Sequence, residues 1–103
     1  MTDSDTLLRI RELVSQEFGV KVHHLVGPCR SRPYAYARFA YCYLAREYTG
    51  ASLHEIAKLL GERDHTTILY GVHRAEILSV DDAEFCEALT RTAAVFEGLT
   101  KAP

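Results

Sequence analysis

The fold of this chain is decided by ten residues, GERDHTTILY, which run from Gly61 to Tyr70. Gly61 can end a helix, because glycine adopts the left-handed conformation that follows a helix without a steric penalty. Asp64 then offers a carboxylate to the unpaired amides at the start of a new helix. A histidine and two threonines crowd into the first turn of that helix. They put hydrogen-bonding groups where ordinary helices carry solubilising residues.

A second helix start lies just upstream of this stretch. Ser52 and Glu55 form the Ser-x-x-Glu pattern of a capping box, and apolar residues follow up to Leu60. A short helix, a glycine turn and a second helix therefore follow one another. This layout predicts a helix-turn-helix over about residues 52–78, whose second helix enters the DNA major groove.

The overall composition indicates one ordinary globular domain. The chain has 103 residues and is 48% hydrophobic, which predicts a single domain over residues 1–103 with a modest core. No apolar run approaches the roughly 20 residues of a membrane span, and the acidic start is unlike a signal peptide. We therefore expect a cytoplasmic, nucleoid-associated protein with no membrane contact. The three cysteines are widely spaced without a Cys-x-x-Cys pair, so neither a disulfide framework nor a zinc ribbon is predicted.

The charges are unevenly distributed. The net charge of −2 argues by itself against a nucleic-acid-binding protein. Residues 21–80, however, hold eight Lys/Arg against five Asp/Glu, whereas the two ends together hold four against nine. All five histidines also lie in the central block. A basic centre between acidic ends is compatible with local DNA contact, although it weakens long-range attraction to DNA.

The remaining sequence predicts an all-α domain of about five helices with short connections. Residues 5–18 carry apolar side chains at helical spacing and stop at Gly19. Residues 20–27 are interpreted as a linker with a short apolar anchor. From Pro33 to about Tyr48, alanines alternate with aromatic residues, which is typical of a long and mostly buried helix. Pro33 suits the first helical position, with Ser31 or Arg32 as its cap.

A last helix is expected after the cap cluster Asp81–Asp82. Residues 98–103 are interpreted as a frayed tail. The side chains expected to face inward from this helix are Phe85, Ala88, Leu89, Thr92, Val95 and Phe96.

The polar first turn after Asp64 has two interpretations. It is either a capped helix with polar surface residues, or a base-reading surface. Threonine contacts a thymine methyl and forms hydrogen bonds, and a carboxylate accepts from cytosine N4 or adenine N6. The capping-box helix and the glycine turn before it favour DNA binding.

Arginines outside this turn are weaker candidates. Arg30 lies in a proline-rich loop and is able to reach a minor groove, as homeodomain arms do; the alternative is a solvated loop. Arg38 and Arg46, eight residues apart, are expected to share one helix face and to hold phosphates. The alternative is an exposed stripe that keeps an aromatic helix soluble.

Other functions have less support in the sequence. The tyrosines of residues 34–48 are expected in the core and at its rim rather than stacked on single-stranded bases. The histidines lack metal-ligand spacing, so no metal is predicted. No nucleophile, carboxylate pair or phosphate-binding loop accompanies His65. We therefore expect neither an enzyme nor a cofactor or nucleotide site.

The stretch from Gly61 to Tyr70 resembles the signature of the C-terminal DNA-binding domain of the bacterial replication initiator DnaA, which typically reads GGRDHTTVLH. The resemblance extends upstream through Ser52, Leu53, Glu55 and Ile56, through LARE at residues 44–47 and RSR at residues 30–32, to FGV at residues 18–20. It covers most of the chain from about residue 14 to residue 78. It implies an all-helical, Trp-repressor-like domain that binds duplex boxes of the TTATCCACA type.

The resemblance also implies a role for each matching residue. It implies major-groove base contacts from the start of the second helix of the motif and a minor-groove contact from the loop. Contacts with the DNA backbone are implied for a further set of residues. The implied base-contacting residues are Arg30, Asp64, His65, Thr66 and Thr67; the implied backbone-contacting residues are Arg32, Arg38, Arg46, Thr49, Leu53, His54, Arg63 and Arg74.

Four departures from the family pattern remove or weaken charge contacts. Tyr36 and His73 stand where the family usually carries basic residues. Glu62 replaces the second glycine of the signature, and His54 stands where proline is frequent. We therefore expect lower affinity than in other family members, with the sequence preference retained.

Two hypotheses follow for the function. In the first, the chain is a sequence-specific double-stranded DNA-binding module that regulates or competes at initiator boxes, in replication initiation or transcription. In the second, it is a protein-interaction module that binds the initiator or another replication factor. No P-loop is present, and 103 residues cannot also hold the family's ATPase domain. The acidic start after Met1 favours a small natural protein over an excised fragment.

Overall fold

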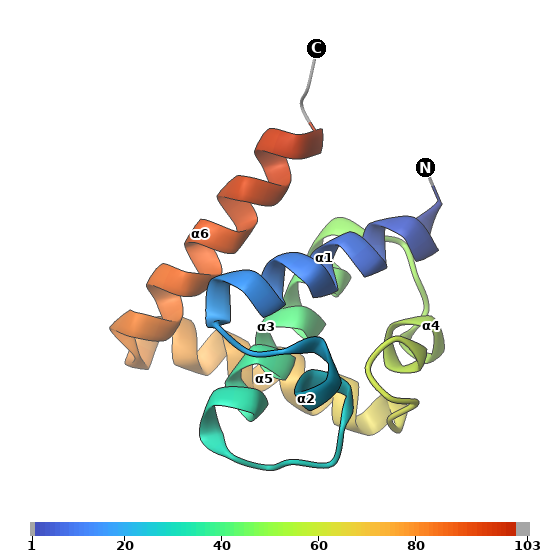
Figure 1. Cartoon of the computed structure of the whole chain (residues 1–103), viewed down its shortest axis with the longest axis horizontal. Coiled ribbons are helices and arrows are strands. Elements are labelled where there is room, and N and C mark those ends of the chain that lie inside the picture. The colour runs from blue at the N-terminus through green and yellow to red at the C-terminus, as the bar shows by residue number, and fades with distance from the viewer. Residues whose placement is uncertain (1, 101–103) are drawn as a thin grey trace.

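The computed structural model describes residues 2–100 and folds them into six α-helices, with no strand among these residues (Figure 1). The prediction of an all-α fold is confirmed. No helix within this range is both long and apolar enough to cross a membrane. The helices are α1 (Asp3–Phe18), α2 (Val22–Val26), α3 (Arg32–Tyr48), α4 (Leu53–Lys58), α5 (His65–Asp81) and α6 (Ala83–Thr100).

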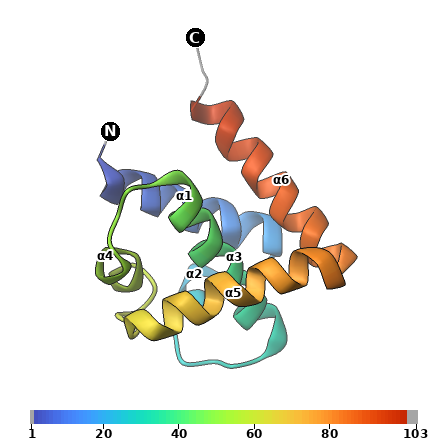
Figure 2. The same ribbon diagram turned by 180° about the vertical axis from the view of Figure 1, so that it is seen from behind.

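Helix α3 lies at the centre of the molecule and contacts α1, α2, α5 and α6 (Figure 2). Its alanines Ala37, Ala40 and Ala45 are fully buried, as the alternation of alanine with aromatic residues predicts. Tyr41 is also fully buried, and its hydroxyl donates a 3.0 Å hydrogen bond to the carbonyl of Ile56 in α4. This bond satisfies the one polar group of a large core side chain. The other tyrosines of α3 are half-buried against the core, as expected.

Helices α3 and α5 approach closely at Gly71. A Cβ atom at this position would lie 2.9 Å from Cys42 Sγ and 3.6 Å from the Phe39 ring. Cys42 itself is almost completely buried. The missing side chain therefore lets α5 rest on α3 and fixes the direction in which the first turn of α5 points.

The helix-turn-helix is built from α4, a turn and α5, as predicted. Both hydrogen bonds of the capping box form, because Ser52 Oγ accepts from Glu55 N at 3.1 Å and Glu55 Oε1 accepts from Ser52 N at 3.0 Å. In the turn, Gly61 has a φ of +81°, and a Cβ there would lie 2.2 Å from the carbonyl oxygen of Val26. Glu62 is also left-handed, with a φ of 57°. The turn thus packs its backbone directly onto the end of α2.

Two helix starts differ slightly from the prediction. Helix α1 begins at Asp3 rather than at residue 5, because Thr2 and Asp5 form a second capping box. Helix α3 follows Ser31 as its N-cap, so Pro33 occupies the second helical position. Gly19 ends α1 with a φ of 66°, as predicted.

Three expectations are wrong. Residues 20–27 were expected to be a linker, but Val22–Val26 form α2, which makes six helices rather than about five. The expected tail begins too early, because α6 continues through Gly98 to Thr100; residues 101–103 lie outside the described range. Val95 was expected to face inward but is 41% exposed, whereas Phe96 is buried. Helical spacing alone does not decide which edge of an apolar face turns to solvent.

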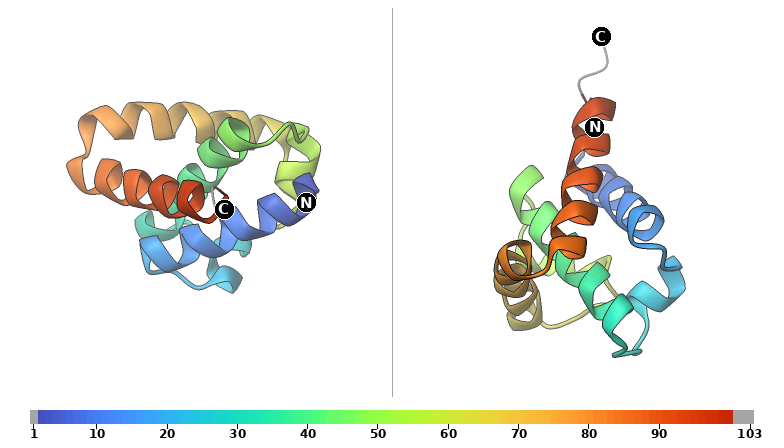
Figure 3. Two further views of the ribbon diagram at one scale, coloured as in Figure 1. Left: turned by 90° about the horizontal axis from the view of Figure 1, so that it is seen from above. Right: turned by 90° about the vertical axis from the view of Figure 1, so that its left-hand side faces the viewer.

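Helix α6 lies between α1 and α5 (Figure 3). Asp82 caps its start by accepting from Phe85 N at 3.1 Å. The Phe85 ring packs edge-on against Phe18 of α1 and Tyr36 of α3, with centroid distances of 5.7 and 5.8 Å. Near the other end, the Tyr48 hydroxyl donates a hydrogen bond to the Glu97 carboxylate. These contacts attach α6 to the core on the side away from α4.

We predict that Gly61→Ala lowers the free energy of unfolding by at least about 2 kcal/mol. A left-handed residue with a Cβ is strained by roughly 1–2 kcal/mol, and the new Cβ would also overlap the Val26 carbonyl. The matched control is Gly98→Ala, where a Cβ meets nothing within 4 Å; helix propensity should raise its stability by about 0.5–1 kcal/mol. Urea unfolding followed by circular dichroism measures both. Equal midpoints for the two variants would contradict the turn geometry.

Candidate nucleic-acid interface

Asp64 caps the start of α5, as predicted. Its Oδ1 atom accepts hydrogen bonds of 2.9 Å from both the backbone N–H and the hydroxyl of Thr66. The backbone bond, and then the hydroxyl bond, lower the pKa of the Asp64 carboxyl below its usual value. Asp64 is therefore ionised at neutral pH and holds the first turn in shape. The predicted base contact of Asp64 is left to its second oxygen, Oδ2.

The first turn of α5 presents its polar side chains to solvent. His65, Thr66 and Thr67 are all exposed, and His65 Nδ1 lies 3.7 Å from Asp64 Oδ1. The next residue, Ile68, is fully buried and anchors the turn to the core. The result is an anchored helix end that displays two hydroxyl groups and an imidazole, all of which are able to form hydrogen bonds with a ligand.

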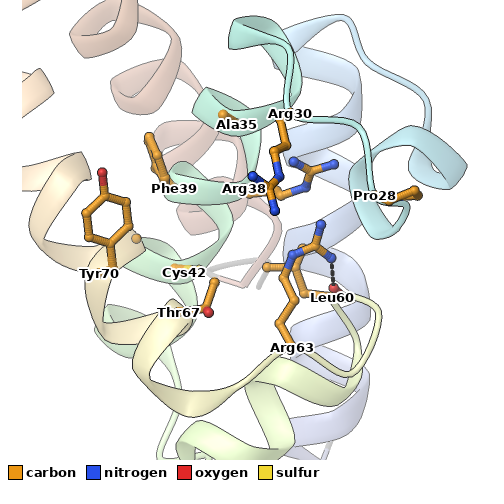
Figure 4. Close-up of a pocket in the computed structure, with 11 residues that line it drawn as sticks. Pro28, Arg30, Ala35, Arg38, Phe39, Cys42, Leu60, Arg63, Thr67 and Tyr70 are labelled. Atoms are coloured by element: carbon orange, nitrogen blue, oxygen red, sulfur yellow. Dashed lines mark hydrogen bonds between the residues drawn. The ribbon is translucent and has the colours of Figure 1, made fainter.

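The loop before α3 carries two exposed arginines. Arg30 and Arg32 are both exposed. The Arg32 guanidinium lies 5.8 Å from the centroid of the Tyr36 ring, a distance at which cation–π attraction acts. Arg30 instead lines a cavity of about 520 Å³ together with Thr67 of α5. In Figure 4 the Arg30 side chain points into this cavity from the loop, opposite Thr67 and Tyr70.

The other predicted backbone contacts come from three helices and one cap. Arg46 and His54 are exposed, and Arg74 is partly exposed. Leu53 is half-buried against the core, so only part of it is open to a ligand. The Thr49 hydroxyl donates to the Ala45 carbonyl at 2.7 Å. Thr49 therefore caps the end of α3, whatever else it contacts.

The expectation that Arg38 and Arg46 share one face is wrong. Arg38 is only 8% exposed, whereas Arg46 is exposed. Eight residues correspond to a rotation of about 80° beyond two full turns, which is enough to carry one side chain inward. Arg38 Nε donates to the Leu25 carbonyl at 2.7 Å, and Nη2 donates to the carbonyls of His24 and Gly27 at 2.8 and 3.0 Å.

Arg63, in the turn of the helix-turn-helix, binds the same segment. Its Nη2 donates to the Gly27 carbonyl at 2.6 Å, and its Nη1 donates to Leu60 at 2.5 Å and to Val26 at 3.4 Å. Arg63 is half-buried. The two arginines therefore converge on the carbonyl end of α2. Figure 4 shows the two side chains near each other at the cavity, with the bond from Arg63 to Leu60. Sequence reasoning assigned both to phosphates and gave no sign of these internal partners.

The two guanidinium groups form a cluster of like charge. Burial, and then the charge of Arg63, lower the pKa of Arg38; burial likewise lowers the pKa of Arg63. The ion pairs found in residues 2–100 involve neither of them. The cavity beside them is lined by no carboxylate. This cavity therefore carries the positive charges of Arg30, Arg38 and Arg63 without a carboxylate in its lining, an arrangement that suits an anion.

Lys58 is a further candidate that sequence reasoning left without a role. It is exposed, and with His54, Glu62 and Arg63 it lines a smaller hollow of about 220 Å³ beside the turn. The spacing of His54 and Lys58 could have indicated this role, because residues four apart share a helix face and His54 was already a candidate for backbone contact. Within residues 2–100, no group of three or more His, Cys, Asp or Glu side chains is placed to hold a metal ion.

Comparisons with known proteins agree with this architecture. A family described as "Bacterial dnaA protein helix-turn-helix" matches residues 8–75. The chromosomal replication initiator protein DnaA of Roseobacter denitrificans is 38% identical over 84 residues, which cover 82% of this chain and 18% of that protein. DnaA of Thermomicrobium roseum is 43% identical over 91 residues, covering 87% of this chain and 19% of that protein. The chain thus spans about a fifth of the length of these relatives.

A solved structure has the same arrangement of helices. It is described as a DNA replication initiation factor, and it superimposes on 91% of this chain and 29% of its own with a TM-score of 0.77 and 28% sequence identity. The family match, over residues 8–75, covers most of α1, all of α2, α3 and α4, and the first part of α5. The chain therefore belongs to the bacterial DnaA helix-turn-helix family, a family of DNA-binding domains.

Proposed function

We propose that this chain binds double-stranded DNA sequence-specifically, at sites of the DnaA-box type. The observation that carries the proposal is the first turn of α5, where His65, Thr66 and Thr67 are exposed on a helix end that Asp64 caps and Ile68 anchors. A helix presented in this way enters the major groove with its N-terminal residues on base edges. The helix N-terminus adds a favourable field for phosphate.

The loop and the neighbouring helices complete the proposed interface. Arg30 projects beside α5 and is proposed to enter the adjacent minor groove. Exposed and partly exposed side chains, most of them basic, are proposed to contact the sugar–phosphate backbone, which positions the protein without reading sequence. These proposed backbone contacts are Arg32, Arg46, Arg74, Thr49, Leu53, His54 and, added from the structure, Lys58.

In the cell, such a domain would act by occupying initiator boxes. We propose a regulatory or competing role in replication initiation or transcription, carried out in the cytoplasm at the nucleoid. Glu62, beside the turn, and the acidic ends of the chain oppose DNA. They would keep the affinity low enough for competition with another box-binding protein to be reversible.

A second candidate function is binding to a replication protein, the initiator included. It is favoured by exposed apolar side chains near the C-terminal end of α5, far along the helix from its polar first turn, with Ile77 at 46% and Val80 at 85% exposure. The two candidates differ in salt dependence. Binding through phosphates weakens steeply with salt, whereas an apolar interface does not.

Thr66→Ala should remove most of the preference for a TTATCCACA-type duplex over a scrambled one. Loss of a base contact typically costs about 1–3 kcal/mol, or roughly 5- to 150-fold in discrimination. Fluorescence anisotropy with the two duplexes measures this ratio. The control is Thr90→Ala, an exposed threonine on α6, which should leave the ratio unchanged. If the unmodified chain binds both duplexes equally and weakly, the DNA proposal fails and the protein-partner function is favoured.

Arg46→Gln should weaken binding to the box and to the scrambled duplex by the same factor. It should also reduce the slope of log K against log salt by about 0.9, since one phosphate contact is lost. The control is Arg9→Gln on α1, whose neighbours in a surface hollow include Asp5 and Glu12. A change in slope for Arg9→Gln equal to that for Arg46→Gln would mean that the slope reports net charge rather than a contact.

A further inference from the structure

Two arginines bind four successive backbone carbonyls, those of residues 24–27. Arg38 holds His24, Leu25 and Gly27, and Arg63 holds Val26 and Gly27. The Gly27 carbonyl accepts from both guanidinium groups. Carbonyls at the end of a helix lack hydrogen-bond donors within that helix. The two arginine side chains supply donors to the last carbonyls of α2.

Helix α2 depends on these contacts for its position. It has five residues, far fewer than a helix needs to be stable by itself in water. The turn of the helix-turn-helix also packs onto its end, since a Cβ at Gly61 would lie 2.2 Å from the Val26 oxygen. One guanidinium comes from α3 and the other from the residue before the α5 cap. The end of α2 is therefore tied to the element that carries the base-reading turn.

The segment held in this way leads directly to Arg30. Gly27 is followed by Pro28 and Cys29, and Arg30 then projects into the cavity beside Thr67. Arg30 has no hydrogen bond to another residue within residues 2–100 that would fix it independently. Arg30 thus lies between two fixed points, the Gly27 carbonyl that both arginines bind and the N-cap of α3 at Ser31. The contacts of Arg38 and Arg63 fix the first of these points.

The same contacts leave these two arginines poorly placed to hold phosphates. Arg38 is 92% buried, with Nε and Nη2 both bound to carbonyls. In Arg63, both terminal nitrogens are bound to carbonyls. Arg46, at the other end of α3, is exposed and serves as the contrasting case.

We propose that Arg63 and Arg38 are positioning residues that fix the distance between Arg30 and the recognition helix α5. They thereby determine selectivity for the base pairs that Arg30 reads, without holding a phosphate themselves. This inference rests on the proposed DNA-binding function, because it assigns a role within that interface.

The test compares Arg63→Gln with Arg30→Ala and the double variant. The affinity of each variant is measured for a set of box duplexes in which single base pairs are changed from A·T to T·A or to G·C. The measurements are repeated at several salt concentrations. A minor-groove contact distinguishes A·T from G·C but not from T·A, so Arg30→Ala identifies the positions that Arg30 reads. We expect Arg63→Gln to lose about tenfold in discrimination at the same positions, with the salt slope unchanged. The double variant should lose no more than either single one.

Arg46→Gln is the matched control, and Arg63→Lys addresses folding. Arg46→Gln should lose affinity uniformly and lower the slope by about 0.9, with discrimination intact. Arg63→Lys keeps the charge but not the planar fork that reaches two carbonyls, so it should keep the slope and still lose discrimination at the Arg30 positions. If circular dichroism shows that Arg63→Gln is unfolded, Arg63→Lys takes its place in the comparison.

A measurement without DNA tests the positioning directly. Amide hydrogen exchange in residues 23–30 should accelerate about tenfold or more in Arg63→Lys and remain unchanged in Arg46→Gln. The inference is overturned if Arg63→Gln lowers the salt slope by about 0.9 with discrimination intact, or if losses from Arg30→Ala and Arg63→Gln multiply. Failure of the proposed DNA-binding function gives a different result from failure of this inference. In that case the unmodified chain shows no preference for the box, even if hydrogen exchange accelerates in Arg63→Lys as expected.

Discussion

The structure depends most on the close contact between α3 and α5, where Gly71 lies against Cys42. A side chain at Gly71 would force these helices apart, because protein interiors are packed as densely as organic crystals. With that contact made, α5 has a fixed direction, and its first turn projects past the core with Ile68 as its last anchor. The central helix also holds α1, α2 and α6. The polar turn is therefore carried by a rigid body rather than by a loop.

The arginine cluster adds a feature that opposes stability. Two guanidinium groups lie together in a cavity lined by no carboxylate, and backbone carbonyls of residues 24–27 and of Leu60 accept their hydrogen bonds. Like charges in a partly dry site repel each other and resist burial. A polyanion on this side would relieve that repulsion.

Local sequence signals predicted the helix-turn-helix well, because each is a contact within three or four residues. Ser52 with Glu55, Asp64 with Thr66, and the left-handed Gly61 all belong to this class. Helix α2 escaped prediction because its support comes from side chains 11 to 37 residues away. The burial of Arg38 was not predicted for the same reason, because its carbonyl partners lie 11 to 14 residues away in the sequence. Base and phosphate contacts carried over from the family resemblance remain predictions, whereas the internal partners of Arg38 and Arg63 emerge only from the packed chain.

Glu62 has a left-handed backbone where the family signature has glycine. The strain of a non-glycine residue there is about 1–2 kcal/mol, but replacing glycine also restricts the unfolded chain, which returns about 0.4–1 kcal/mol. The net cost to folding therefore lies between zero and about 1.6 kcal/mol, and the same residue places an acidic side chain beside the turn. A change at this one position therefore alters the charge next to the proposed ligand and the melting temperature together, so relatives that differ here are expected to differ in both.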